Sequence, residues 1–324
     1  MQKGTVIKST GSWYQVKLDE PSPAGDRLLS CRVAGRFRLD DLQLTNPIAV
    51  GDRVAVEIET TSDAETGAIR RIEPRRNFVV RQSPRRKHQL HLLASNIDQA
   101  VLITTIVSPG LKLGFIDRFL LMTEPFSIPT VIVFNKADLY GEEEMETFEV
   151  VRSIYEDIGY RLLLVSALTG EGIAELRELL TGKRTLLSGQ SGVGKSTLVN
   201  AVEPGFSLRT GELSDYTGKG QHTTTFAEQF DLSFGGELID TPGIKTLSFN
   251  YLKPADVAHN FRELFALSSE CRFGGSCLHR EEPGCAVKES VETGDDRVTD
   301  LRYYSYLQLL EETEGQNYWE RKQV

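Results

Sequence analysis

The chain contains the stretch Gly189-Gln190-Ser191-Gly192-Val193-Gly194-Lys195-Ser196, which matches the pattern G-x-x-x-x-G-K-[ST]. The apolar run Arg184–Ser188 precedes it, and a segment with helical spacing, Thr197–Val202, follows it. A phosphate-binding loop needs this context of a strand before it and a helix after it. The glycines let backbone amides curl around phosphate oxygens, beside the positive end of the helix. The stretch therefore predicts a nucleotide-binding α/β domain.

The chemistry of a nucleoside triphosphate assigns roles within this loop. Lys195 is expected to reach the β- and γ-phosphates, and the hydroxyl of Ser196 is expected to ligate Mg²⁺. A glycine-rich turn before a helix is the alternative, which the strand and helix around it disfavour. The predicted phosphate contacts are Gly189, Gln190, Ser191, Gly192, Val193, Gly194, Lys195, Ser196 and Thr197.

Two further motifs indicate guanine rather than adenine. Asn135-Lys136-Ala137-Asp138 ends the apolar run Thr130–Phe134. The carboxylate of Asp138 can accept both N1–H and the exocyclic amine of guanine, a donor pair that adenine lacks, and an unpaired buried carboxylate rejects the wrong base. We expect Asn135 to brace the loop and the stem of Lys136 to lie along the base. Ser166, Ala167 and Leu168 end another apolar run, where a backbone N–H can meet guanine O6.

The magnesium ion needs ligands from other segments as well. Asp240-Thr241-Pro242-Gly243 follows the short apolar run Glu237–Ile239, as D-x-x-G does in GTPases. Asp240 is expected to hold Mg²⁺ through water. Among Thr223, Thr224 and Thr225, Thr224 is the preferred candidate to complete the coordination of Mg²⁺. The alternative for these threonines is the start of a β-strand.

Catalysis is expected to depend on Lys195 and on the amide of Gly243, which senses the γ-phosphate. Ras-like enzymes carry a glutamine directly after D-x-x-G that orients the attacking water, but this chain has Ile244 there. Isoleucine neither donates nor accepts a hydrogen bond, so intrinsic hydrolysis should be slow. We hypothesise that His222 orders the water instead; a contact to RNA or a cap of the loop is the alternative.

The order of the motifs is unusual. Ordinary GTPases begin with the phosphate loop and place N-K-x-D near the end, whereas here N-K-x-D and S-A-L come before the phosphate loop. Joining the old termini and reopening the chain elsewhere preserves the site, because the termini of compact domains often lie close together. We predict a circularly permuted GTPase domain over residues 96–250. Its alternating segments predict a parallel sheet with helices on both faces, with strands at 100–105, 130–134, 162–165 and 184–188 and helices at 116–122, 142–158 and 173–180.

The segments before this domain have a different pattern. Residues 1–75 contain five short strand-like runs without helical spacing, at 4–8, 13–18, 28–33, 53–58 and 68–72, which predicts a small all-β barrel of the OB or SH3-like type. A basic linker, 76–95, is expected next. Beside a barrel, such charge indicates binding to RNA phosphates, although a solvated linker is the alternative. The candidate RNA contacts are Arg70, Arg71, Arg75, Arg76, Arg81, Arg85, Arg86 and Lys87.

The last region, 251–324, is expected to be mostly helical, with helices at 254–267 and 298–312. Between them lie Cys271, Cys277, His279 and Cys285. Three thiolates and one imidazole form a complete tetrahedral set for one structural Zn²⁺. Reduced cysteines without a metal are the alternative.

Composition limits the class of protein. The chain of 324 residues has a net charge of −9, 40% hydrophobic and 26% charged residues, which is typical of a globular protein. Residues 1–98 carry 16 Lys and Arg against 12 Asp and Glu, so the basic excess lies at the front and the acidic excess behind it. The sequence contains no signal peptide pattern and no apolar run of the length that spans a bilayer, so a cytoplasmic location without a membrane partner is expected.

The motifs NKAD, SAL, GQSGVGKST, HTTT and DTPG in this order, with a barrel before them and CRF…EPGC after them, closely resemble the ribosome small-subunit-dependent GTPase A family (RsgA, YjeQ or YloQ). The resemblance covers nearly the whole chain. It implies an OB barrel and a GTPase that binds GTP and GDP, contacts 16S rRNA on the 30S subunit late in its maturation, and is stimulated by that subunit. The interval Cys271–Cys277 is one residue longer than the family's pattern, and we expect its glycine-rich loop to absorb the difference.

Two other functions stay open at this point. One is an RNA-binding assembly scaffold that uses GTP as a conformational ligand with negligible turnover, which Ile244 keeps open. The other is a permuted GTPase that acts on a different ribonucleoprotein. The chain has no long coiled-coil pattern, so a monomer is expected.

Overall fold

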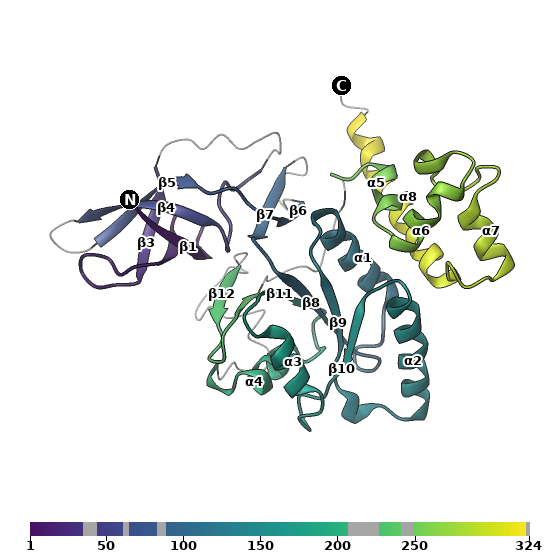
Figure 1. Cartoon of the computed structure of the whole chain (residues 1–324), viewed down its shortest axis with the longest axis horizontal. Coiled ribbons are helices and arrows are strands. Elements are labelled where there is room, and N and C mark those ends of the chain that lie inside the picture. Colours follow the sequence, from purple (N-terminus) through teal and green to yellow (C-terminus); the bar gives the residue numbers. More distant parts are fainter. Residues whose placement is uncertain are drawn as a thin grey trace.

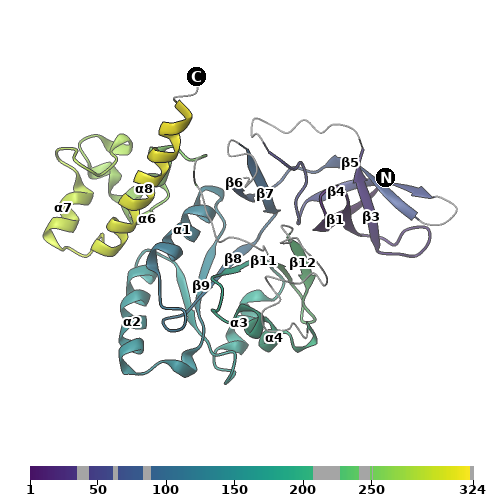
Figure 2. The same cartoon turned by 180° about the vertical axis from the view of Figure 1, so that it is seen from behind.

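The computed structural model describes residues 1–34, 44–60, 65–82, 89–206, 227–240, 249 and 251–321. Figures 1 and 2 show three regions: a β barrel, a central α/β layer and a helical region on the far side of that layer from the barrel. In the described part of the chain, no helix combines the length and the apolar character that crossing a membrane requires.

The barrel is built from five strands and closes on itself. Strand β1 pairs with both β2 and β4, and β3 pairs in parallel with β5, so the order around the barrel is β1-β2-β3-β5-β4 and back to β1. Alternate side chains point inward, and Val6, Val16, Val54 and Ile69 are fully buried. The predicted five-stranded barrel is confirmed. Its strands are β1 (Gln2–Ser9), β2 (Tyr14–Leu18), β3 (Leu28–Val33), β4 (Arg53–Thr60) and β5 (Glu65–Ile72).

The segment that the sequence predicted as a linker contains an antiparallel hairpin. Strand β6 (Phe78–Gln82) pairs with β7 (Leu90–Ser95). Val79, Val80 and Leu92 are buried, and they supply the apolar surface that holds the hairpin against its neighbours. The neighbouring basic residues concealed this short apolar alternation.

The central sheet has the order β10-β9-β8-β11-β13-β12, in which β12 alone is antiparallel to its neighbour. From β8 the chain adds β9 and β10 on one side, then returns to place β11 on the other. Loops that follow β8 and β11 therefore leave in opposite directions and open a crevice at the carboxyl edge of the sheet. The strands are β8 (Gln99–Thr104), β9 (Thr130–Phe134), β10 (Arg161–Leu164), β11 (Arg184–Gly189), β12 (Glu228–Asp231) and β13 (Glu237–Asp240).

Helices cover both faces of this sheet, as predicted. On β8, Leu102 faces a core shared with α1 (Leu113–Thr123) and α2 (Glu142–Glu156). Its neighbour Val101 faces α3 (Ile173–Leu180) and α4 (Lys195–Val202). This is the alternation expected of strands that are buried on both sides. Short 3₁₀ turns are η1 (Glu124–Phe126), η2 (Ala137–Leu139) and η3 (Pro204–Phe206).

The helical region packs on the α1 and α2 side and shares one continuous apolar core with it. The single helix predicted over 254–267 is wrong: Asn260 ends the first helix, its side-chain amide donating to the carbonyl of Asp256 (2.7 Å), and Phe261 has extended backbone. The elements are α5 (Pro254–His259), α6 (Arg262–Leu267), η4 (Ser268–Glu270), η5 (Gly274–Ser276), α7 (Ala286–Thr293) and α8 (Asp300–Arg321).

Candidate nucleotide site and metal cluster

The predicted phosphate loop connects β11 to α4 at the carboxyl edge of the sheet. Gly192 (φ 89°) and Gly194 (φ 86°) have left-handed backbone, which favours glycine. A Cβ at Gly194 would lie 2.6 Å from Nδ2 of Asn135. One at Gly189 would lie 2.7 Å from the carbonyl oxygen of Ile103. Gly189 and Gly194 are therefore required by close packing against strand β8 and the loop that follows β9.

The phosphate loop and the D-x-x-G strand meet through their charged residues. Nζ of Lys195, at the start of α4, lies 2.6 Å from Oδ1 of Asp240, at the end of β13. Both side chains have at most 15% of their surface exposed. The amine predicted to bind phosphate and the carboxylate predicted to hold Mg²⁺ thus share one small volume, next to Ser196 in the first turn of α4.

Asn135 joins the three loops that surround the predicted base and phosphates. Its Nδ2 donates to the carbonyl of Val193 in the phosphate loop (2.8 Å), and its Oδ1 accepts the N–H of Ala167 (3.2 Å). The side chain is 1% exposed, so these bonds are shielded from water. The S-A-L segment also binds Asp138 directly, because the Ser166 hydroxyl donates to its Oδ1.

Lys136 makes contacts that its motif does not predict. Its Nζ donates to the carbonyls of Ser108 (2.6 Å) and Gly192 (2.7 Å). The lysine therefore ties the phosphate loop to the loop after β8, which no motif marks. The position of Ser108 beyond the carboxyl end of a central strand is the one sequence signal that points to it.

Tyr140 is a second residue that the motifs did not indicate. Its hydroxyl accepts the N–H of Ile106 (2.9 Å) and donates to the carbonyl of Asn135 (3.0 Å). Burial is the main cause that raises the pKa of this phenol, so the group stays protonated near neutral pH.

Several predicted site residues lie outside the described residues. They are His222, Thr223, Thr224, Thr225, Gly243 and Ile244. The structure brings together the remaining ones, from β9, β10, β11 and β13, at one edge of the sheet.

The four predicted metal ligands are gathered in one buried cluster. The ligand atoms of Cys271, Cys277, His279 and Cys285 all lie within 4.8 Å of one another. Nδ1 of His279 is 3.6 Å from Sγ of Cys271 and 3.4 Å from Sγ of Cys285, and these two sulfurs are 4.0 Å apart. Tetrahedral Zn²⁺ with bonds of about 2.3 Å to sulfur and about 2.0 Å to nitrogen separates its ligands by about 3.6–3.8 Å. The donor set and spacing fit a tetrahedral metal ion.

Hydrogen bonds and turns support the shape of this cluster. The hydroxyls of Tyr303 and Tyr306 on α8 donate to the carbonyls of His279 and Leu278 (both 2.6 Å). The turn η5 lies within the Cys271–Cys277 interval. Burial raises the pKa of the Cys277 thiol to about 12, and a bound metal ion opposes that effect because it coordinates the thiolate.

The candidate RNA contacts fall into groups with different surroundings. Arg70, Arg71 and Arg76 are at the surface, in pairs with Glu57, Glu73 and Asp98. Arg85, Arg86 and Lys87 lie outside the described residues.

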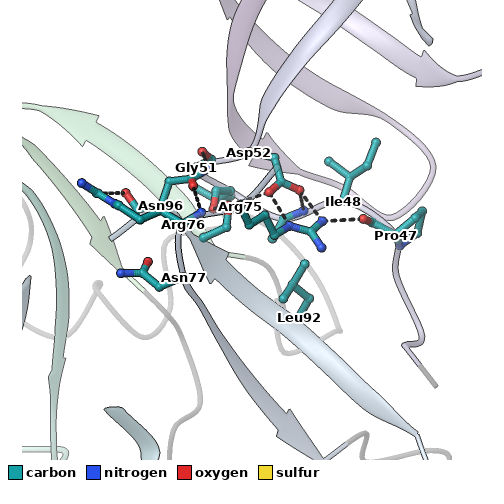
Figure 3. Close-up of polar contacts among 12 residues, drawn as sticks. Pro47, Ile48, Gly51, Asp52, Arg75, Arg76, Asn77, Leu92 and Asn96 are labelled. Carbon is teal, nitrogen blue, oxygen red and sulfur yellow. Dashed lines mark hydrogen bonds and ion pairs between the residues drawn. The ribbon is translucent and has the colours of Figure 1, made fainter. Parts of the chain in front are cut away.

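Arg75 and Arg81 are not surface residues. The Arg75 side chain is 16% exposed and Arg81 is 7% exposed. Arg75 binds Asp52 with two hydrogen bonds and the carbonyl of Pro47 with a third, all of 2.7 Å (Figure 3). These bonds engage the Nε and Nη2 groups of the guanidinium, and through them Arg75 holds the segment before the hairpin against the residues that precede β4.

Known proteins resemble this chain over nearly its whole length. The RsgA GTPase family matches residues 72–250, and the RsgA N-terminal domain matches residues 3–69. The small ribosomal subunit biogenesis GTPase RsgA of Flavobacterium johnsoniae is 46% identical over 308 residues, which are 95% of this chain and 92% of that protein. The protein of the same name from Bacteroides fragilis is 45% identical over 316 residues, 98% of each chain.

Two solved structures share the fold. YjeQ from Thermotoga maritima aligns with a TM-score of 0.74 and 33% identity, over 97% of this chain and 99% of that one. YloQ, described as a circularly permuted GTPase, aligns with a TM-score of 0.70 and 30% identity, over 97% and 96%. These matches confirm the predicted family, the permuted fold and the GTPase class. The chain belongs to the RsgA family of circularly permuted GTPases.

Proposed function

We propose that this chain hydrolyses GTP to GDP and phosphate while bound to the small ribosomal subunit, and that it assists the maturation of that subunit. The observation that carries the proposal is the meeting of four loops at one sheet edge, with Lys195 against Asp240 and Asn135 between the phosphate loop and S-A-L. The relatives named above are small ribosomal subunit biogenesis GTPases, which supplies the partner.

Within this site, the residues of the chain divide the work between phosphate and base. The backbone amides of 189–197 bind the phosphates, and Lys195 stabilises the charge that develops on them during transfer. Ser196 and, through water, Asp240 would hold Mg²⁺, with Thr224 as a further ligand, and the ion would neutralise charge on the phosphate oxygens. Asp138 accepts the N–H groups of guanine, and the Ser166 hydroxyl on Asp138 Oδ1 fixes the orientation of that carboxylate.

Orientation of the attacking water is assigned to His222. Ile244 has no hydrogen-bonding group at the position after D-x-x-G, so the water needs another partner. The amide of Gly243 contacts the γ-phosphate. We propose that the subunit, once bound, holds His222 in place, which makes hydrolysis dependent on the subunit.

The cysteine cluster is proposed to hold one structural Zn²⁺ through Cys271, Cys277, His279 and Cys285. Zn²⁺ would join η4, the loop of η5 and the start of α7, which are short elements. All four ligand positions are filled by protein, so the ion supplies stability and no catalysis.

The proposed contact with 16S rRNA uses the barrel and the basic residues next to it. Arg70, Arg71 and Arg76 are exposed enough to exchange their carboxylate partners for phosphates, since surface ion pairs stabilise a protein weakly. Arg85, Arg86 and Lys87 extend the same basic stretch in the sequence. This chemistry favours RNA backbone over a particular base sequence.

Substitution of Asp138 by Asn tests the nucleotide site. An amide cannot accept two N–H bonds from guanine, so we expect the affinity for GDP to fall at least about 100-fold, while xanthine nucleotides, whose base presents a carbonyl in place of the amine, gain affinity. Titration with fluorescent GDP and XDP measures both. Asp157→Asn, at the exposed end of α2, is the control, and equal GDP affinity in the two variants would contradict the assigned site.

A further inference from the structure

We propose that Tyr140 is a positioning residue for guanine recognition, whose hydroxyl fixes the N-K-A-D loop against the loop that follows β8. Tyr140 belongs to none of the GTPase motifs, and it directly follows η2, two residues after Asp138. The inference rests on the proposed guanine-nucleotide site and adds to it a residue that acts through Asn135.

The hydroxyl of Tyr140 uses both its donor and its acceptor capacity. It accepts the backbone N–H of Ile106 (2.9 Å) and lies 3.0 Å from the carbonyl oxygen of Asn135, to which it donates. The hydroxyl of Thr105 is an alternative acceptor for the Tyr140 O–H at the longer distance of 3.4 Å. The two short contacts therefore join the backbone of the loop after β8 to the backbone of N-K-A-D.

These bonds close a ring of contacts around the site. Asn135, whose carbonyl accepts the bond from Tyr140, donates from its side-chain Nδ2 to the carbonyl of Val193 in the phosphate loop (2.8 Å). Nζ of Lys136 donates both to the carbonyl of Gly192 in the phosphate loop and to the carbonyl of Ser108 in the loop after β8. The hydroxyl of Tyr140 is the link through which that loop holds the carbonyl of Asn135. Removing it opens the ring at one point without changing the identity of any motif residue.

The backbone beside this link is held in an uncommon conformation. Lys136 has φ 69° and ψ 36°, in the left-handed region that a residue with a side chain keeps only where surrounding contacts hold it. The carbonyl of Asn135 belongs to the peptide that enters Lys136, so the bond from Tyr140 constrains that peptide directly. Because Asp138 follows two residues later, a shift of this peptide moves the carboxylate that reads the base.

The test is the conservative variant Tyr140→Phe, which removes one oxygen and keeps the ring. We expect release of fluorescent GDP to become about 3- to 10-fold faster, because the two part-buried hydrogen bonds of this hydroxyl are lost. We also expect a smaller preference for GDP over IDP, because inosine lacks the exocyclic amine that Asp138 accepts. Thermal unfolding without nucleotide tests for a change in the fold.

Tyr160→Phe is the matched control. The hydroxyl of Tyr160 donates to Glu124 (3.0 Å), in a part-buried contact away from the loops of the site. We expect this variant to keep the wild-type rate of GDP release and the wild-type preference for GDP over IDP.

The outcomes separate this proposal from the function on which it rests. Wild-type rates and selectivity in Tyr140→Phe would overturn the positioning role. So would equal acceleration in both variants, since that indicates general destabilisation. If the wild-type protein fails to prefer GDP over ADP, the proposed guanine site itself is wrong. Faster release with reduced guanine selectivity in Tyr140→Phe alone supports the proposal.

Discussion

Asp52 shows how one buried carboxylate organises the junction between the barrel and the hairpin. It is fully buried, and its two oxygens accept bonds from the guanidinium of Arg75 (Figure 3). They also accept bonds from the hydroxyl of Ser95 (2.6 Å) and the amide of Ala49 (2.9 Å). Gly51 beside it has φ 93°, and a Cβ there would lie 2.1 Å from the carbonyl oxygen of Ser95. Two segments more than 40 residues apart are thus held in direct backbone contact.

Substitution Arg75→Ala leaves this carboxylate buried without its ionic partner. We expect a loss of about 3–5 kcal/mol in the free energy of unfolding, the usual effect of breaking a buried ion pair from one side. The matched control is Arg70→Ala, whose pair with Glu57 is exposed and is worth about 0–1 kcal/mol. Urea denaturation measures both, and similar losses in the two variants would contradict the role of Arg75.

Single residues differ in how far the sequence predicts them. Asp138, Lys195 and Asp240 stand in motifs whose spacing follows from the chemistry of the nucleotide, so their positions were predictable. The burial of Arg75 was not, because its partner Asp52 is 23 residues away and only the closed barrel brings the two together. Tyr140 was missed for the same reason: its partner Ile106 lies on another strand's loop.

At the scale of elements, periodicity predicted the strands and helices that have a regular apolar face. The barrel strands and the strands β8–β11 lie within a few residues of the predicted ranges. The hairpin β6–β7 was missed because its apolar alternation is short and has basic neighbours. The helical spacing of 254–267 continues through Asn260, yet the helix ends there, and Phe261 has extended backbone with its buried ring against Tyr306 of α8.

The cysteine loops carry the proposed Zn²⁺ site. We expect the purified chain to contain one Zn²⁺, and Cys277→Ser to lose it and to unfold at a lower temperature, because metal binding and folding of such loops are coupled. The control is Cys31→Ser, which changes a buried cysteine in the barrel core outside the cluster.

Atomic emission measures the zinc content and calorimetry measures the unfolding temperature. Full zinc content in Cys277→Ser, or equal zinc loss in the Cys31 variant, would contradict the assigned ligands.

The two outer regions of the molecule, the barrel and the helical region, pack against different parts of the GTPase domain. The helical region packs on α1 and α2, where Arg302 of α8 forms a buried ion cluster with Asp117 and Glu263. The barrel lies against the opposite edge, where Lys8 pairs with Glu228 (2.9 Å). Figure 1 shows this division.

The barrel therefore contacts β12, the strand that directly follows the predicted switch threonines in sequence. Lys17 of β2 forms a second ion pair with Asp231 of β12 (2.5 Å). The helical region instead adjoins the half of the sheet that carries N-K-A-D. The net charge of −9 does not indicate how charge is divided between these regions, because the basic excess lies in residues 1–98 and the acidic excess in the rest.

The proposed dependence of GTP hydrolysis on the small ribosomal subunit is tested by the rate of phosphate release from GTP, with and without purified small subunits. We predict slow release of phosphate from the chain alone and a rise of at least about tenfold with small subunits, the size expected when a catalytic water is positioned. Large subunits should give no rise. His222→Ala should lose the rise and keep its affinity for GTP. Equal rates with and without the small subunit, or an equal rise with the large subunit, would show that hydrolysis does not depend on the small subunit.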